Sequence, residues 1–258
     1  MWGIRLDTAT GRLALEVRDA DVLLTHFYTL EVSSHSMKRL YLPQAQAWWQ
    51  GLEEATDGLL FLHGYGDRKL GQHRGILAMS AETGSLAWEQ PLLAFYGLAA
   101  EGLLAFTAAK PEASFTLLHT QTGKVLQEGI SQQEAAGRVQ AYNTSRFSQS
   151  TYPTLYLAGE EYFTQVGAFL QARLGVEPKK AIEYAETEGC FIVSFYGAEA
   201  DGKLSNRLAV FDLAGELQIN VQMGTGLSGI GSDTFFIFKD ELYFILNKDT
   251  LKAYRLLV

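Results

Sequence analysis

The stretch from residue 63 to residue 74 concentrates side chains that can transfer protons or bind metals. His63, Tyr65, Asp67 and His73 all fall within it. Imidazole, carboxylate and phenol groups can act as acid, base or ligand, and the glycines between them would let a loop fold closely around a bound molecule. No known metal-ligand spacing is met, so no metal site is assigned from the pattern. A charged surface hairpin remains the alternative interpretation.

Two other pairs of residues could contribute to a site. Glu16 and Arg18 alternate with apolar residues near a strand end, where they could face a polar pocket or form a cross-strand ion pair. Trp48 and Trp49 could stack on a sugar or a peptide. Because adjacent strand residues face opposite ways, we expect one tryptophan in the core and only the other exposed.

Two stretches that could suggest chemistry do not support it. The glycine-rich segment 224–231 has no lysine and opens no helix, so it does not match a phosphate-binding loop. We interpret it as a turn leading to a strand over 234–238. Ser194 lies within a strand pattern rather than a nucleophile elbow, so serine hydrolase chemistry is not supported.

Strands and tight turns must position these residues. Short apolar runs bounded by glycine, aspartate and asparagine dominate the chain, which predicts an all-β fold. Four such runs each follow acidic residues: Leu59–Leu62, Leu103–Phe106, Phe191–Tyr196 and Leu242–Leu246. The same unit of antiparallel strands therefore recurs along the chain.

One segment departs from the strand pattern. Apolar residues fall at helical intervals over Glu160–Leu174, and Gly175 and Pro178 follow. This predicts one short amphipathic helix as an insertion. The polar segment Ser131–Thr151 before it predicts a long loop.

A turn motif repeats with the strands. Residues 78–88, Ala-Met-Ser-Ala-Glu-Thr-Gly-Ser-Leu-Ala-Trp, resemble the blade repeat of quinoprotein-type β-propellers, in which a strand turns through Thr-Gly and ends in a docking tryptophan, here Trp88. Related turns place glycines at Gly11, Gly84, Gly123 and Gly215. A hairpin of this length needs a residue at positive φ, which glycine adopts without steric cost. The resemblance implies a propeller fold and not the quinone cofactor.

The spacing of the turn glycines predicts the number of blades. The intervals fit one or two units of about 40–45 residues, the length of a four-stranded blade. We therefore expect a six-bladed propeller, with five or seven blades as alternatives. The C-terminal strands lack a turn glycine after them and the N-terminus begins with one, so we expect N- and C-terminal strands to pair and close the ring.

The chain also resembles a bacterial family of propeller-like proteins of unknown function. Three segments carry this resemblance: Leu-Glu-Val-Arg-Asp at 15–19, His-Gly-Tyr-Gly-Asp at 63–67, and Gly-Ile-Gly-Ser-Asp-Thr-Phe-Phe at 229–236. The resemblance implies no chemistry.

Composition narrows the class of protein. The 258 residues are 47% hydrophobic with a formal net charge of −8, which is ordinary for a globular domain, and residues 1–258 are expected to form a single domain. No basic cluster is long enough to follow a phosphate backbone, so nucleic acid is not an expected partner. No apolar run approaches the roughly 18 residues of a membrane helix. We expect a cytoplasmic protein without membrane contact.

The sequence leaves the function open. The leading hypothesis is a non-enzymatic binding or scaffolding propeller that contacts a protein or a small-molecule ligand through one loop face. The alternative is an enzyme with a polar site at the channel mouth built from His63, Asp67 and His73, which could act with or without a metal ion. A subunit interface formed by exposed aromatic residues is a third possibility. No cofactor is indicated and the catalytic residues are unknown.

Overall fold

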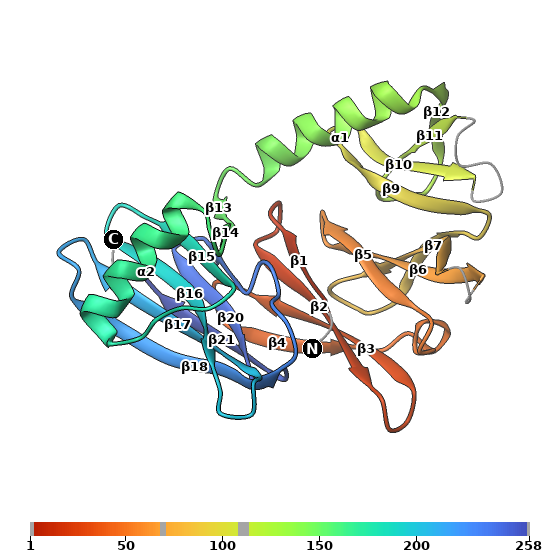
Figure 1. The fold of residues 1–258 in the computed structure, drawn as a ribbon. Coiled ribbons are helices and arrows are strands. Elements are labelled where there is room, and N and C mark those ends of the chain that lie inside the picture. The colour runs from red at the N-terminus through yellow and green to blue at the C-terminus, as the bar shows by residue number, and fades with distance from the viewer. Residues whose placement is uncertain (1–2, 68–70, 108–113, 257–258) are drawn as a thin grey trace. The chain divides into compact units, whose positions relative to one another are not determined.

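The computed structural model describes residues 3–67, 71–107 and 114–256, and antiparallel strands make up most of them (Figure 1). These strands form five sheets of four or five strands each. The all-β prediction is confirmed. The chain divides into two compact units, residues 1–147 and 148–258. The prediction of a single domain stays a prediction.

The first unit holds three four-stranded sheets whose strands are neighbours in chain order, the strand topology of a propeller blade. The first sheet is β1 (Gly3–Asp7), β2 (Arg12–Asp19), β3 (Leu24–Glu31) and β4 (Ser36–Leu40). The second is β5 (Gly51–Thr56), β6 (Leu59–Asp67), β7 (Gln72–Ser80) and β8 (Leu86–Gln90). The third is β9 (Leu93–Ala99), β10 (Gly102–Thr107), β11 (Phe115–Leu118) and β12 (Val125–Ile130).

Strand β6 shows how the sheets of the first unit pack on one another. Leu60 and Leu62 belong to an apolar cluster with residues of the first sheet, whereas Leu59 and Phe61 pack with residues of the third. Successive side chains of a strand point to opposite faces, so the apolar run of β6 buries both faces. Trp88 of β8 is 8% exposed in the second of these clusters. The docking tryptophan of the turn motif is therefore buried between the second and third sheets.

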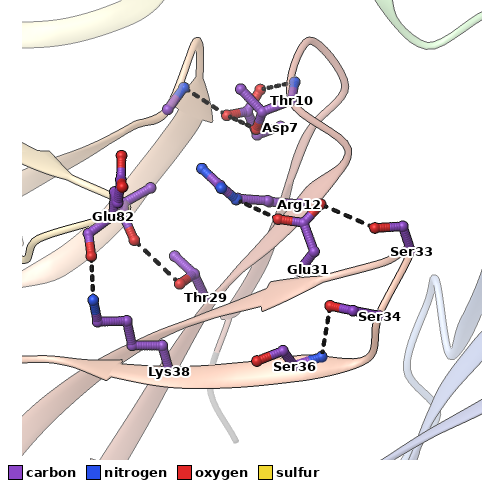
Figure 2. Close-up of polar contacts among 12 residues, drawn as sticks. Asp7, Thr10, Arg12, Thr29, Glu31, Ser33, Ser34, Ser36, Lys38 and Glu82 are labelled. Atoms are coloured by element: carbon purple, nitrogen blue, oxygen red, sulfur yellow. Dashed lines mark hydrogen bonds and ion pairs between the residues drawn. The ribbon is translucent and has the colours of Figure 1, made fainter.

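Polar contacts also join the first sheet to the second (Figure 2). The Asp7 carboxylate accepts hydrogen bonds from the backbone N–H groups of Asp57 and Gly58 in the β5–β6 turn, at 3.2 and 2.8 Å. The Thr29 hydroxyl donates to the Ala81 carbonyl at 3.3 Å. The Lys38 ammonium donates to the Glu82 carbonyl. These contacts satisfy backbone groups in turns where no ladder partner is available.

The second unit holds two sheets. One contains β14 (Thr154–Leu157), β15 (Ala181–Glu186), β16 (Cys190–Ala198), β17 (Leu204–Asp212) and β18 (Leu217–Leu227). The other contains β13 (Ser150–Thr151), β19 (Phe235–Phe238), β20 (Glu241–Leu246) and β21 (Thr250–Arg255). An apolar cluster that includes Ile192, Leu208, Phe235 and Phe244 joins the two.

The predicted helix is confirmed as α2 (Glu161–Leu174), which ends at Gly175 with φ 67°. Leu170 packs against residues of β15, β16 and β17. The predicted loop over residues 131–151 is wrong for most of its length, because α1 (Gln132–Arg146) occupies it. The Ser131 hydroxyl caps this helix by accepting a hydrogen bond from the Glu134 N–H at 3.2 Å.

The predicted six blades are not found among the described residues, and the turn glycines explain the difference. All four have positive φ, but they do not hold equivalent places: Gly84, Gly123 and Gly215 each connect the last two strands of a sheet, whereas Gly11 connects the first two. The long interval between Gly123 and Gly215 contains both α-helices rather than another four-stranded sheet. Equal spacing was therefore a poor measure of sheet number.

The predicted pairing of the chain's terminal strands stays a prediction, because the two strands belong to different units. Strand β1 is the edge of its own sheet, beside β2, while β21 lies beside β20 in another sheet. The last sheet does take a strand from far upstream, but that strand is β13, where Ser150 pairs with Phe238. Strand β2 pairs with β3 along its whole length, so the N-terminal hairpin belongs to the first sheet.

Candidate metal centre

A β-bulge in the second sheet places the central carboxylate of the site. Strand β5 pairs Leu52 with Leu62 and Glu54 with Phe61, so Glu53 is the extra residue between the two pairs. The Arg5 guanidinium donates to the Glu53 carbonyl at 2.6 Å. Bulges leave one residue out of the ladder and redirect its side chain. The bulge turns the Glu53 carboxylate toward the next two strands.

The other residues of the site come from β6 and β7. Tyr65 pairs with His73 across these strands, and His63 lies two residues before Tyr65 on the same face. His63 also pairs with Gly51 of β5. A Cβ on Gly51 would lie 2.7 Å from Cε1 of His63, so the missing side chain provides the space for this imidazole.

Three side chains converge at this position. Nδ1 of His63 lies 2.9 Å from Oε1 of Glu53, and Nδ1 of His73 lies 2.7 Å from the same oxygen. The two imidazole rings stack with their centroids 3.5 Å apart and an angle of 11° between their planes. The Tyr65 ring meets both imidazoles edge-on, at 5.3 and 5.2 Å.

Burial and charge act in opposite directions on Glu53. Burial alone raises the pKa of this carboxyl, but hydrogen bonding and Coulomb attraction from His63 and His73 outweigh it, so the pKa lies below its ordinary value of 4.5. The carboxylate form is therefore favoured. The side chain of His63 is 7% exposed and that of His73 is 40% exposed, so the cluster extends from the interior to the surface.

The ligand types suit a metal ion, but the two stacked imidazole rings would have to turn for both Nδ1 lone pairs to point at one ion. One ligand atom from each of Glu53, His63 and His73 lies within 4.8 Å of the others. Two ligand atoms at about 2.0–2.1 Å from one tetrahedral ion are separated by about 3.4 Å, so the nitrogen–oxygen distances of 2.9 and 2.7 Å would have to lengthen by roughly half an ångström on binding. Two imidazoles and one carboxylate are a common ligand set for zinc and for non-haem iron.

Glu16 and Arg18 form a second layer beside the cluster. The Arg18 guanidinium donates to Glu16 at 2.6 Å, and the other Glu16 oxygen accepts the Leu52 N–H at 2.7 Å. Both charged side chains are nearly buried. Arg18 and Glu16 form this ion pair along one face of the same strand, β2, rather than across two strands. A Cβ on Gly51 would lie 3.3 Å from the Arg18 guanidinium and 2.7 Å from His63, so Arg18 and His63 both border Gly51.

The two tryptophans do not lie as predicted. Trp48 and Trp49 fall in a turn between the 3₁₀ helix Pro43–Ala45 and β5, so the alternation of a strand does not apply to them. Trp48 is half-buried, with the Arg18 guanidinium 5.4 Å from its ring centre, and neither tryptophan belongs to the core. Trp49 is 39% exposed and meets the Tyr65 ring at 5.8 Å.

The structure brings together His63, Tyr65 and His73, and it adds Glu53. The backbone of Asp67 pairs with Gln72, but the Asp67 side chain lies outside the described part of the structure. Sequence analysis missed Glu53 because the regular register counted back from the Asp57-Gly58 turn would pair Glu53 with Leu62 and Leu52 with His63. The bulge shifts the register of β5 by one residue, so that Leu52 pairs with Leu62 and the Glu53 side chain is free to face His63.

Comparison with known proteins places the cluster within a matched segment. The family described as Domain of unknown function (DUF4905) matches residues 6–88, which span most of the first two sheets and include Glu53, His63 and His73. No curated protein matches the chain. None of the described helices is both long and apolar enough to cross a membrane.

Solved structures resemble the chain at low similarity. The β-propeller domain of the Trilobed protease from Pyrococcus furiosus is 10% identical with a TM-score of 0.35, over 99% of this chain and 81% of that one. A prolyl endopeptidase is 9% identical with a TM-score of 0.35, over 98% of this chain and 49% of its own length. A eukaryotic initiation factor is 9% identical with a TM-score of 0.24, over 99% and 88%. The likeness to quinoprotein-type blades stays a prediction.

Proposed function

We propose that this chain is a binding domain built from propeller-type blades and that it holds a divalent transition-metal ion at Glu53, His63 and His73. The observation that carries the proposal is the convergence of both histidine Nδ1 atoms on one Glu53 oxygen, at 2.9 and 2.7 Å. The ion would compete with protons for the imidazole nitrogens and the carboxylate oxygen. Binding therefore releases protons, and affinity falls as pH is lowered.

The ligand types favour zinc over harder ions. Imidazole suits zinc, copper, iron and nickel, whereas calcium and magnesium prefer sites made only of oxygen. The ionised state of Glu53 is compatible with binding at neutral pH.

A metal-dependent enzyme is the second candidate. Catalytic zinc sites have three protein ligands and keep a fourth position for water or substrate, and this cluster offers three. The His73 side chain is 40% exposed, so solvent can reach that side of the cluster. Tyr65 would then border the open position.

Calorimetric titration of the chelator-treated full chain with Zn²⁺ tests the proposal. We expect one site with a Kd of about 1 μM or tighter at pH 7.5. His73→Ala and Glu53→Gln should each weaken binding at least about tenfold, which corresponds to about 1.4 kcal/mol. His26→Ala is the matched control, because His26 is a surface histidine bonded to Arg39 in the same unit. Binding that survives His73→Ala and Glu53→Gln, or no binding at all, would overturn the proposal.

The same samples distinguish the binding-domain proposal from the enzyme proposal. Zn²⁺-loaded protein and His73→Ala are compared on a panel of activated esters and phosphate esters. Turnover that requires both the metal and His73 supports the enzyme. One bound ion without turnover supports the binding domain.

A further inference from the structure

The second unit contains a pocket of about 590 Å³ that is separate from the Glu53 cluster. It lies among the ends of β16, β17 and β18, the segment 229–234 and the β20–β21 turn. This volume is within the range of about 300–1,000 Å³ that is usual for small-molecule sites. The glycine-rich segment 224–231 was predicted to be a turn, but residues 224–227 form the end of β18, and only residues 228–231 are irregular. Both parts contribute to the pocket wall.

Hydrogen bonds fix the wall of this pocket. The Tyr196 hydroxyl accepts the Gly231 N–H at 2.8 Å, and the buried Glu183 carboxylate accepts the Thr234 N–H at 3.0 Å. On the opposite side, the Asn247 N–H donates to the Met223 carbonyl at 2.8 Å. Both ends of the loop over residues 229–234 are therefore attached to β15 and β16. A wall that is ordered before binding reduces the entropy cost of ligand capture.

A chain of hydrogen bonds orients the amide that faces the pocket. The Thr234 hydroxyl contacts Ser194 at 2.7 Å, and Ser194 donates to Oδ1 of Asn206 at 3.0 Å. Ser194 is fully buried and Asn206 is 5% exposed. Because Ser194 occupies the amide oxygen, the NH₂ group of Asn206 is the part that remains to donate to a ligand.

We propose that this pocket binds a small, uncharged, polyhydroxylated molecule of the sugar class. Each sugar hydroxyl both donates and accepts hydrogen bonds, and the pocket offers both functions from Asn206, Asp233, Asn247 and the Tyr196 hydroxyl. Met223, Leu227, Ile230 and Ile245 supply apolar surface for the C–H faces of the ring.

Other ligand classes fit this lining less well. An apolar ligand would remove water from the Asn206 NH₂ group without giving it a partner, which is costly. A phosphate or carboxylate ligand would meet one carboxylate, Asp233, and one ammonium, Lys248, so the lining offers it no net positive charge in a protein of net charge −8. A neutral polyol avoids both penalties.

Titration of the full chain with a panel of neutral mono- and disaccharides, followed by calorimetry and by ligand-observed NMR, tests this proposal. Glucose 6-phosphate, leucine and hexanol represent the anionic, zwitterionic and apolar alternatives. We expect at least one saccharide to bind with a Kd of about 1 mM or tighter and each comparator to bind more weakly.

Two variants locate the binding. Asp233 has φ 53° and Asp240 has φ 62°, and both are exposed aspartates of the second unit, but only Asp233 lines the pocket. Asparagine tolerates this backbone conformation, so Asp233→Asn should weaken saccharide binding about tenfold while Asp240→Asn leaves it unchanged. Ile230→Trp, at an exposed position of the wall, should block the pocket without disturbing the core.

Three results would overturn the proposal: no saccharide bound at about 10 mM, tighter binding of a comparator, or binding that survives both Asp233→Asn and Ile230→Trp. The result is independent of the metal, because no residue of the Glu53 cluster is altered.

Discussion

The indole of Trp88 covers the turn glycine Gly123, so that a Cβ on Gly123 would lie 2.6 Å from Cε3 of Trp88. The indole N–H also donates to the Thr120 carbonyl in the same turn, at 2.7 Å. The last strand of the second sheet is thereby attached to the last hairpin of the third. Burial of a large aromatic ring and satisfaction of its polar atom both favour this contact.

Removal of this indole should destabilise the first unit. We expect Trp88→Ala to lower the free energy of unfolding by about 3–5 kcal/mol, as for other large buried aromatic residues. Urea unfolding followed by circular dichroism measures the change. Trp49→Ala is the control at an exposed position and should cost less than about 1 kcal/mol. A similar small loss for both variants would mean that Trp88 does not dock the sheets.

The glycine under the indole should be as sensitive as the indole itself. Gly123→Ala introduces a methyl group against Trp88 and a side chain at φ 64°, whereas Gly129→Ala introduces only the strained backbone, since no atom lies within 4 Å of its Cβ at φ 75°. We expect Gly129→Ala to cost about 1 kcal/mol and Gly123→Ala to cost at least about 2 kcal/mol more. Thermal unfolding of both variants would reveal equal losses if the close approach were unimportant.

The sequence predicted the strands better than it predicted their assignment to sheets. Period-2 patterns and turn glycines depend on local backbone geometry, which is why Gly84, Gly123 and Gly215 all lie in hairpins with positive φ. Sheet membership depends on which hairpin a turn closes. The turn at Gly11 carries the same Thr-Gly pair as those at Gly84 and Gly123 but closes a different pair of strands, so counting turns gave six units where the described residues form five sheets.

The sequence predicted only the part of the candidate site that depends on local hairpin geometry. His63, Tyr65 and His73 follow from one hairpin, β6–β7, whose residues are close in sequence. Glu53 reaches them only because a bulge changes the register of β5, and a shift of one residue moves a side chain to the other face of a sheet. Its neighbour Glu54 lies on that other face, where it forms an ion pair with Arg146.

Gly51 should control the metal site without supplying a ligand. Its Cβ would lie 2.7 Å from Cε1 and 2.9 Å from Nε2 of His63, so Gly51→Ala must move the imidazole. We expect Zn²⁺ affinity to fall at least about tenfold, as measured by calorimetry. Gly64→Ala is the control, because its Cβ would approach the Arg74 carbonyl no closer than 3.4 Å. Equal affinities for the two variants would contradict this placement of His63.

Glu53 should make the stability of the metal-free protein depend on pH. Its pKa in the folded state lies below 4.5, so ionised Glu53 stabilises the fold above pH 4.5, and this contribution is lost as pH falls through the folded-state pKa. With chelator present, the unfolding free energy of the unaltered chain should exceed that of Glu53→Gln at neutral pH. The difference should shrink in acid. A constant difference across that range would show that the histidines do not hold the carboxylate.

Glu183 in the second unit should show the opposite dependence. Burial raises the pKa of this carboxyl above 4.5 and outweighs the hydrogen bonds from Thr234, while the nearby Asp233 raises it further. Because the folded state holds the proton more tightly than the unfolded chain, the stabilisation is complete below pH 4.5 and is lost as pH rises through the folded-state pKa.

Urea unfolding of the unaltered chain and of Glu183→Gln between pH 4 and pH 8 measures this dependence. The unfolding free energy of the unaltered chain, relative to Glu183→Gln, should decrease as pH rises. An increase over the same range would mean that Thr234 stabilises the carboxylate more than burial destabilises it, so that the pKa of Glu183 is lowered instead.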